Sequence, residues 1–111
     1  MFPPIKDGDK LYLVTRSDLS PGYQAVQSCH AMRQFVADFP DVDKEWFKKS
    51  NYLALLTVGD ESELAELANK AAERGFRCAR FYEPDVDDAL TAIALEPAAR
   101  SLCKKLSLAL E

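Results

Sequence analysis

The sequence predicts an α/β fold: a single three-layer α/β/α domain built on a mixed four-stranded sheet. Short apolar runs typical of buried strands alternate along the chain with amphipathic helical stretches, an order typical of α/β domains. The length of 111 residues suits one domain, because two halves of that size would each lack an adequate core. We expect residues 1–9 to form an N-terminal tail and residues 10–111 to form the domain.

The first half of the chain predicts the order strand, helix, helix, strand. The apolar run Leu11–Val14 predicts a buried strand, and Pro21 followed by Gly22 suits the start of a helix. That helix ends at Pro40, and its predicted buried stripe recurs in steps of four and three residues: Ala25, Cys29, Met32, Val36 and Phe39. A short helical piece over 43–49 precedes a second strand over 52–58, which is apolar on both faces and therefore expected in the centre of the sheet.

The second half begins with a clear helix signal. Asp60 followed by Glu63 resembles a capping box, and Gly75 lies where a glycine ends a helix. We expect a third strand over 76–82, an acidic loop, a fourth strand over 91–95 and a last helix over 98–105; residues 106–110 are a candidate for a short edge strand. The first three strands should be parallel, because helices join them, and the fourth should run antiparallel to the third.

Composition and motifs exclude several classes of protein. The net charge of −4 and the pI of about 5.0 argue against a protein that binds nucleic acid over its whole surface, although 14 lysines and arginines leave room for a local basic groove. His30 is the one histidine, and the glycine-rich nucleotide motifs and the G-x-S-x-G elbow are absent. We therefore expect no metal and no cofactor.

The cysteines and the apolar runs predict where the protein acts. Cys29, Cys78 and Cys103 contain no C-x-x-C pair, so they fit neither a disulfide framework nor a zinc ribbon. We expect reduced thiols in a cytoplasmic protein, with Cys29 in the core. The sequence begins with no signal-like segment, and its apolar runs are shorter than the ~18 residues of a membrane span, so we expect no membrane association.

The most informative motifs surround the first predicted helix. Val14-x-Arg16-x-Asp18-Leu19 is followed by Gly22-x-x-Ala25-x-Gln27-x-x-His30-Ala31. Further along the chain are Trp46, the Asp60–Leu64 helix start and the Thr91–Pro97 motif T-x-I-A-L-x-P. In order and spacing, roughly residues 10–110 resemble the Pth2-type peptidyl-tRNA hydrolases of archaeal and eukaryotic type. The greatest similarity is to their divergent peptidyl-tRNA hydrolase domain-containing branch.

The resemblance implies hydrolysis of the ester between a peptide and the terminal ribose of tRNA, by a cytoplasmic homodimer whose partner is peptidyl-tRNA or tRNA. Carried over residue by residue, it implies four catalytic residues: Glu83, Thr91, Gln27 and His30. It implies four substrate-binding residues: Arg16, Asp18, Gly22 and Tyr23. Lys48 and Lys49 are further candidates for contacts to the tRNA backbone. The hypothesis requires the start of the first helix and the end of the third strand to share one pocket.

Three departures from the family pattern favour an alternative. Tyr23 replaces a family lysine, and a phenol is neutral at pH 7. Glu83, followed by Pro84-Asp85-Val86, replaces an aspartate followed by A-G-x-T. Of the family's threonines before and within the last strand, only Thr91 has a counterpart. The alternative function is a catalytically impaired Pth2-fold module that binds RNA or a protein partner.

Each candidate residue also has a purely structural interpretation. His30 borders the predicted core, and Arg16 with Asp18 suits a local ion pair or a turn cap. Gln27 can bond to backbone, and Thr91 can be explained by its strand propensity. The acidic stretch 83–88 suits a solvated loop, which would repel phosphates that face it.

Overall fold

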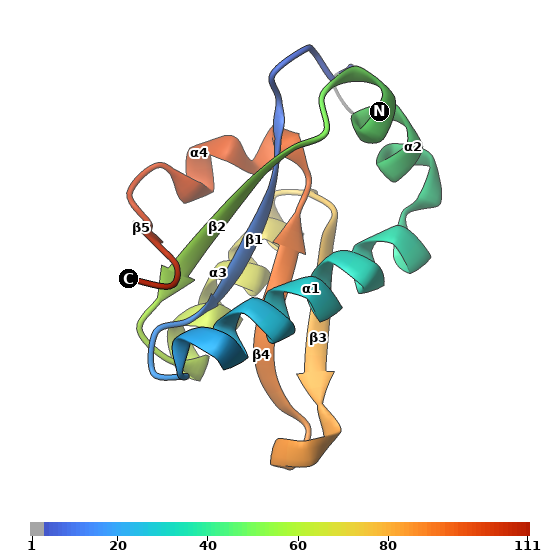
Figure 1. Cartoon of the computed structure of the whole chain (residues 1–111). Helices are drawn as coiled ribbons and strands as arrows, with labels where there is room; N and C mark the ends of the chain where they lie inside the picture. Colours follow the sequence, from blue (N-terminus) through green and yellow to red (C-terminus); the bar gives the residue numbers. More distant parts are fainter. Residues whose placement is uncertain (1–3) are drawn as a thin grey trace.

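A computed structural model describes residues 4–111 of the chain (Figure 1). The elements follow one another as β1 (Lys10–Arg16), α1 (Pro21–Asp38), α2 (Pro40–Lys49), β2 (Tyr52–Val58), α3 (Glu61–Glu73), β3 (Cys78–Glu83), β4 (Ala89–Leu95), α4 (Arg100–Cys103) and β5 (Ser107–Leu108). A single 3-10 turn over 84–86 joins β3 to β4, and a second over 97–99 precedes α4. The predicted α/β class and the order of the elements are confirmed.

The strands form one mixed sheet in the order β3-β4-β1-β2-β5. β1 and β2 pair in parallel, whereas β4 pairs antiparallel with both β1 and β3. The first three strands therefore share one direction and the fourth opposes it, as predicted. The sheet has five strands rather than four, because residues 107–108 pair antiparallel with the outer side of β2.

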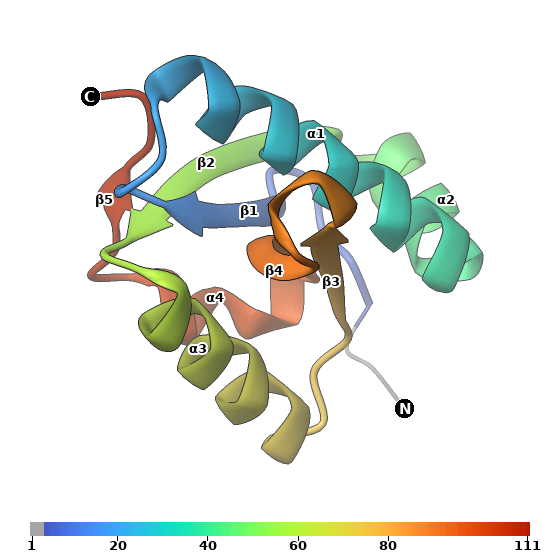
Figure 2. The same ribbon diagram turned by 90° about the horizontal axis from the view of Figure 1, so that it is seen from below.

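Helices cover both faces of the sheet, which makes three layers (Figure 2). One core lies beneath α1 and α2, where Phe35 and Trp46 pack against Leu11 and Leu13 of β1. The other lies against α3 and α4. Alternate strand residues supply it, together with apolar residues of both helices: Tyr12, Val14, Ile93, Leu64, Ala68 and Cys103. No helix of the described chain is long and apolar enough to cross a membrane.

The buried face of α1 differs from the predicted stripe, and this prediction was wrong by one position. The buried residues are Gln24, Gln27, Ser28, Ala31 and Phe35. Cys29 is exposed rather than in the core. The apolar stripe lies on the flank of the helix because the centre of its buried face holds two glutamine amides, which find hydrogen-bond partners inside the protein.

The ends of α3 explain why β3 begins later than predicted. Asp60 caps the helix by accepting from the N–H of Glu63 at 3.0 Å, and Glu63 accepts from the N–H of Gly59 at 3.1 Å. At the other end Gly75 has a φ of +79°, and the N–H of Phe76 donates to the carbonyl of Ala71 at 2.9 Å. Because this helix-ending motif uses Phe76, the chain becomes extended only from Cys78. The last helix is likewise shorter than predicted, since residues 97–99 form a 3-10 turn and α4 covers 100–103.

Residues preceding β1 contact the domain. Ile5 is buried in the core beneath α1 and α2, and its N–H donates to the Glu45 carboxylate at 3.2 Å. The Ser50 hydroxyl donates to the carbonyl of Asp9. Residues 1–3 of the predicted tail lie outside the described residues.

Candidate functional site

A buried amide connects the three elements of the candidate site. Gln27 of α1 donates through Nε2 to Oε1 of Glu83, the last residue of β3, at 2.9 Å. Its Oε1 accepts from the Thr91 hydroxyl of β4 at 2.6 Å. Gln27 and Thr91 are fully buried and Glu83 is 8% exposed. Since an ionised carboxylate only accepts and the hydroxyl here donates, the amide has one orientation that satisfies both neighbours.

A β-bulge directs Thr91 toward α1. The pairing of β3 with β4 passes from Phe81↔Ala92 to Tyr82↔Leu90, so Thr91 is the extra residue. Leu90 belongs to the core against α3 and α4, whereas Ala92 belongs to the core beneath α1. The bulge thus turns two successive side chains, 91 and 92, to the same face, which regular alternation would not allow. Strand propensity alone therefore does not account for Thr91.

Both carboxylate oxygens of Glu83 have donors. Oε1 accepts from Gln27, and Oε2 accepts from the N–H of Asp85 at 3.4 Å, where Glu83 caps the 3-10 turn. Hydrogen bonding from Gln27 is the main reason why the pKa of Glu83 is lowered, and the Asp85 N–H, His30 and Tyr23 contribute to it. The Glu83 side chain is largely covered by its immediate neighbours, but it lies near the surface of the molecule. It is accordingly ionised at neutral pH, at the rim of the sheet.

Tyr23 and His30 lie on the same side of α1 as Gln27, four residues before it and three residues after it. Burial raises the pKa of Tyr23, and the charges of Glu83 and Asp85 and a hydrogen bond to Glu83 raise it further, so the phenol is neutral. The His30 ring stacks on Phe81 of β3, with centroids 4.5 Å apart and planes 10° apart. Both side chains border the carboxylate from the same helix.

The first turn of α1 begins close to these residues. Ser20 caps the helix by accepting from the N–H of Tyr23 at 3.4 Å. A Cβ built on Gly22 would meet no atom within 4 Å, so the backbone at this position is open to an approaching group. The start of α1 carries no acidic residue in its first turn, and its positive dipole end is uncompensated there. The start of the first helix and the carboxylate at the end of β3 are therefore neighbours through Tyr23.

Arg16 and Asp18 are not part of this cluster. Arg16 donates from Nε and Nη2 to the two carboxylate oxygens of Asp18, each at 3.0 Å, and from Nη1 to the carbonyl of Leu90 at 3.2 Å. Strand alternation places Arg16 on the face covered by α3. The hydrogen bonds to Asp18 are the main reason why the pKa of its guanidinium is raised, and the charges of Asp18, Glu61 and Asp60 contribute. The local ion pair that the sequence allowed is present, and it holds the turn after β1.

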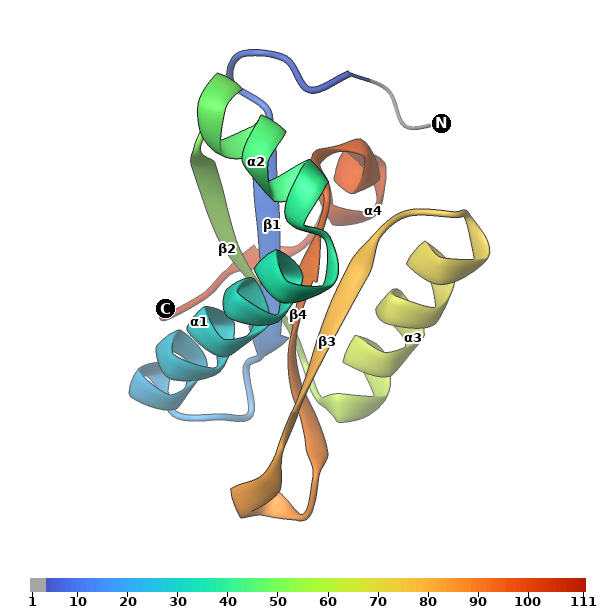
Figure 3. The same ribbon diagram turned by 90° about the vertical axis from the view of Figure 1, so that its right-hand side faces the viewer.

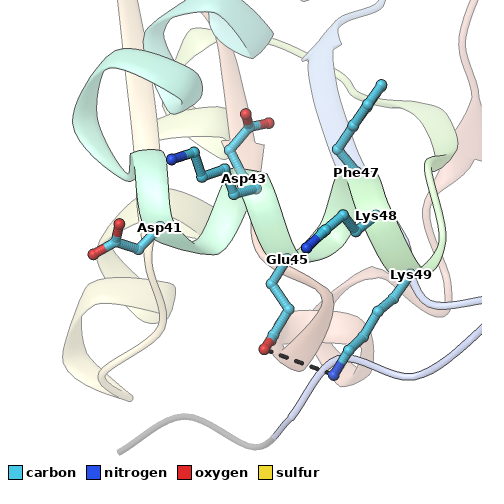
Figure 4. A pocket seen from close by; sticks show the side chains of 7 residues that line it. Asp41, Asp43, Glu45, Phe47, Lys48 and Lys49 are labelled. Carbon is cyan, nitrogen blue, oxygen red and sulfur yellow. Dashed lines mark ion pairs between the residues drawn. The ribbon is translucent and has the colours of Figure 1, made fainter.

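Two cavities of the described chain are not lined by Gln27, Glu83 or Thr91. A hollow of about 610 Å³ runs along α2, where Glu45 and Lys49 form an ion pair at 3.8 Å (Figure 4). Another, of about 570 Å³, is lined by Ser17, Gln24 and Thr57 together with residues of the C-terminal segment. The α2 hollow shares no residue with the candidate site, and α1, about 27 Å long, separates it from Tyr23. The candidate site is therefore defined by its hydrogen bonds and not by a cavity.

Two residues that support the site were not predicted from the sequence. The Thr15 hydroxyl of β1 donates to the carbonyl of Thr91 at 2.7 Å, which anchors the bulge from the neighbouring strand. The N–H of Asp85 holds the second oxygen of Glu83. A polar residue directly after the apolar run Leu11–Val14 was the only available signal for Thr15, and no sequence pattern indicated the role of a backbone N–H.

Comparison with known proteins identifies the family. The chain matches the family described as peptidyl-tRNA hydrolase PTH2 over residues 9–111. It belongs to this family. A solved structure of a protein of unknown function from Agrobacterium tumefaciens strain C58 is similar, with a TM-score of 0.62 and 14% identity over 89% of this chain and 96% of that chain. That similarity shows the fold alone. No curated protein matched the sequence.

Proposed function

We propose that this protein hydrolyses the ester between a peptide and the terminal ribose of tRNA. Membership of the peptidyl-tRNA hydrolase PTH2 family supports the substrate class. The observation that carries the proposal is the chain of hydrogen bonds from Thr91 through Gln27 to Glu83. This chain holds an ionised carboxylate in one orientation beside the open first turn of a helix.

In the proposed reaction Glu83 orients the attacking water. A carboxylate with a lowered pKa is a weak base, so it positions the water and accepts its proton as the new bond forms. The water oxygen bonds to the ester carbonyl carbon, and the bond from that carbon to the ribose oxygen then breaks. The proton held by Glu83 passes to the ribose oxygen, which leaves as a hydroxyl. Gln27 and Thr91 are positioning residues in this scheme.

The developing oxyanion needs donors on the other side of the carbonyl. The backbone N–H of Gly22 at the open start of α1 is the nearest candidate, because the N–H of Tyr23 donates to Ser20 and its phenol is bonded to Glu83. His30, stacked on Phe81, offers an exposed ring against which a terminal base could stack. We propose Arg16 and Asp18 as supports of the turn that leads into α1, with no direct contact to substrate.

The test compares two glutamines of one helix. Glu83→Gln and Gln27→Ala should each lower kcat for peptidyl-tRNA by about 100-fold or more, the usual contribution of a positioned acid–base group. Gln34→Ala is the matched control, because within residues 4–111 the Gln34 side chain bonds to Asp38 alone, on the surface of the same helix. Wild-type turnover at the background rate, or Gln27→Ala equal to Gln34→Ala, would refute the proposal.

One set of observations favours the alternative, a binding module for RNA or a protein partner. Tyr23 supplies no positive charge, and the loop after Glu83 adds three carboxylates close to the site, namely Asp85, Asp87 and Asp88. Tyr23→Lys distinguishes the two functions. A large gain in hydrolysis marks a weakened enzyme, whereas no gain together with salt-sensitive tRNA binding by the wild type supports the binding module.

The homodimer implied by the family resemblance and the cytoplasmic location expected from the reduced thiols stay predictions. Light scattering over a range of protein concentrations tests the first, and fractionation of cells tests the second. Exposed large apolar residues such as Phe47, Tyr52 and Leu53 are candidates for an interface between copies.

A further inference from the structure

β3 is an edge strand whose outer side is open. It stands at one end of the sheet order and pairs only with β4 among the described residues. Figure 3 shows β3 between α1 and α3, with no ribbon of residues 4–111 across its outer side. Natural proteins usually protect a long edge with proline, a bulge or a covering element. The six residues of β3 contain no proline, and the bulge lies on β4.

The pairing with β4 fixes which backbone groups of β3 point outward. The carbonyl of Arg77, immediately before the strand, accepts from the N–H of Glu96 at 3.2 Å. In an antiparallel pair, bonded and non-bonded residues alternate. The N–H and carbonyl groups of Cys78, Arg80 and Tyr82 therefore point away from β4, and each residue offers one donor and one acceptor to an added strand.

The open edge leads directly to the candidate site. β3 ends at Glu83, whose carboxylate is bonded to Gln27. From Cys78 to Glu83 the strand covers about 16 Å, the length of five extended residues. The helix flank beside it carries Tyr23 and His30, and His30 packs on Phe81 of the strand itself.

We propose that the outer edge of β3 binds the peptide part of the substrate as an added parallel strand, with the peptide's C-terminal ester at Glu83. This inference rests on the proposed function. Only a peptide that runs parallel to β3 brings its C-terminus, where the tRNA is attached, to the Glu83 end. Bonds to the peptide main chain are independent of its side chains. This suits an enzyme whose substrates carry peptides of many sequences.

The first experiment compares substrates of different peptide length. Wild-type protein is expected to hydrolyse pentapeptidyl-tRNA with a kcat/KM about tenfold higher than that for N-acetylaminoacyl-tRNA. The factor is modest because the entropy lost on ordering the peptide offsets most of the free energy of the added hydrogen bonds. An N-methyl scan of the pentapeptide should lower kcat/KM at alternate residues, because successive residues of a paired strand point their N–H groups to opposite sides. Equal kcat/KM for the two lengths overturns the inference and leaves the hydrolase proposal standing.

The second experiment changes the edge itself. Arg80→Pro removes an outward N–H without removing a bond to β4, a position at which an edge strand tolerates proline. Arg80→Pro should bring the ratio of kcat/KM for pentapeptidyl-tRNA to kcat/KM for N-acetylaminoacyl-tRNA close to one. Arg80→Ala removes the same side-chain bond to Asn69, 3.1 Å long, but keeps the N–H, so it should retain the wild-type ratio. The same ratio in both variants overturns the inference.

A binding measurement separates this inference from the hydrolase proposal. The probe is the pentapeptidyl amide of 3′-amino-3′-deoxyadenosine, which cannot be hydrolysed as an ester. On its addition, the backbone amides of Cys78, Arg80 and Tyr82 should become protected from hydrogen exchange. Protection of these amides in a protein that shows no ester turnover would support the strand pairing and refute the hydrolase proposal. The three amides could instead be protected in the peptide-free protein, with protection that increases with protein concentration. In that case a second copy of the chain occupies the edge and the inference fails.

Discussion

At the scale of single residues, the site is defined by a side chain that sequence reasoning treated as ambiguous. Gln27 offers a donor and an acceptor from one amide, and the protein uses both, on a carboxylate and a hydroxyl. Gln27 is the principal donor to Glu83. The lowered pKa of Glu83 depends first on Gln27 and only last on Tyr23.

Thr91→Val tests this network through stability. Valine has nearly the same shape but leaves Oε1 of Gln27 without its donor in a fully buried place. We expect the free energy of unfolding to fall by about 1–3 kcal/mol, the cost of an unsatisfied buried polar group. Thr57→Val is the control, because the Thr57 hydroxyl makes only a 3.5 Å contact to the carbonyl of Ser107. Urea denaturation measures both, and equal losses would contradict the network.

Glu96 predicts a pH dependence at the other end of β4. Burial raises the pKa of Glu96, against the lowering effects of the Arg77 N–H bonded to it and the Arg77 charge. Because the pKa of Glu96 is higher in the folded protein than in the unfolded chain, ionisation favours the unfolded chain. The free energy of unfolding therefore falls as pH rises from the unfolded pKa through the folded pKa. Glu96→Gln should therefore match the wild type near pH 4 and exceed its unfolding free energy at pH 7. Denaturation at the two pH values, with exposed Glu66→Gln as control, measures the difference; a pH-independent difference would refute it.

At the scale of elements, apolar spacing predicts which segments form helices and strands better than it predicts which side is buried. The pattern located α1 but placed its buried face one position away, because Gln24 and Gln27 are buried through specific bonds and not through hydrophobicity. The bulge at Thr91 was likewise unpredictable, since it depends on the register between β3 and β4. By contrast, the α3 capping signals are local, and the structure confirms them.

The capping of α3 gives a prediction at this scale. Asp60→Ala removes the acceptor for the Glu63 N–H, and loss of such a cap costs about 1 kcal/mol. In a domain of this size that loss lowers Tm by about 4 °C or slightly more. Ser62→Ala, in the exposed first turn of the same helix, is the control and should leave Tm nearly unchanged. Calorimetry measures both, and an unaltered Tm for Asp60→Ala would show that the cap contributes nothing to stability.

At the scale of the whole molecule, topology gathers acidic residues at the end that carries the candidate site. β1, β2 and β3 all run toward the end that carries the candidate site, so the capping acids of α3 and the acidic loop after β3 gather there. The lysines in the last turns of α2 and α3 lie at the other end, because those turns precede β2 and β3. Near the site Arg16 is paired with Asp18. The overall charge of −4 was available from the sequence, but this polarity needed the fold.

That polarity predicts how tRNA binding responds to the loop. Asp87 and Asp88 have φ values of +54° and +58°, a conformation that asparagine adopts as readily as aspartate. The double variant Asp87→Asn, Asp88→Asn therefore removes two charges with little effect on the backbone. We expect it to raise the affinity for tRNA about tenfold or less at low ionic strength. The gain should vanish at high salt, because salt then screens the repulsion between tRNA and the two aspartates of the wild type. Asp7→Asn, in an exposed turn before β1, should change little. Filter binding across a salt series measures the three proteins, and a gain that persists at high salt would mean that the loop acts by contact and not by charge.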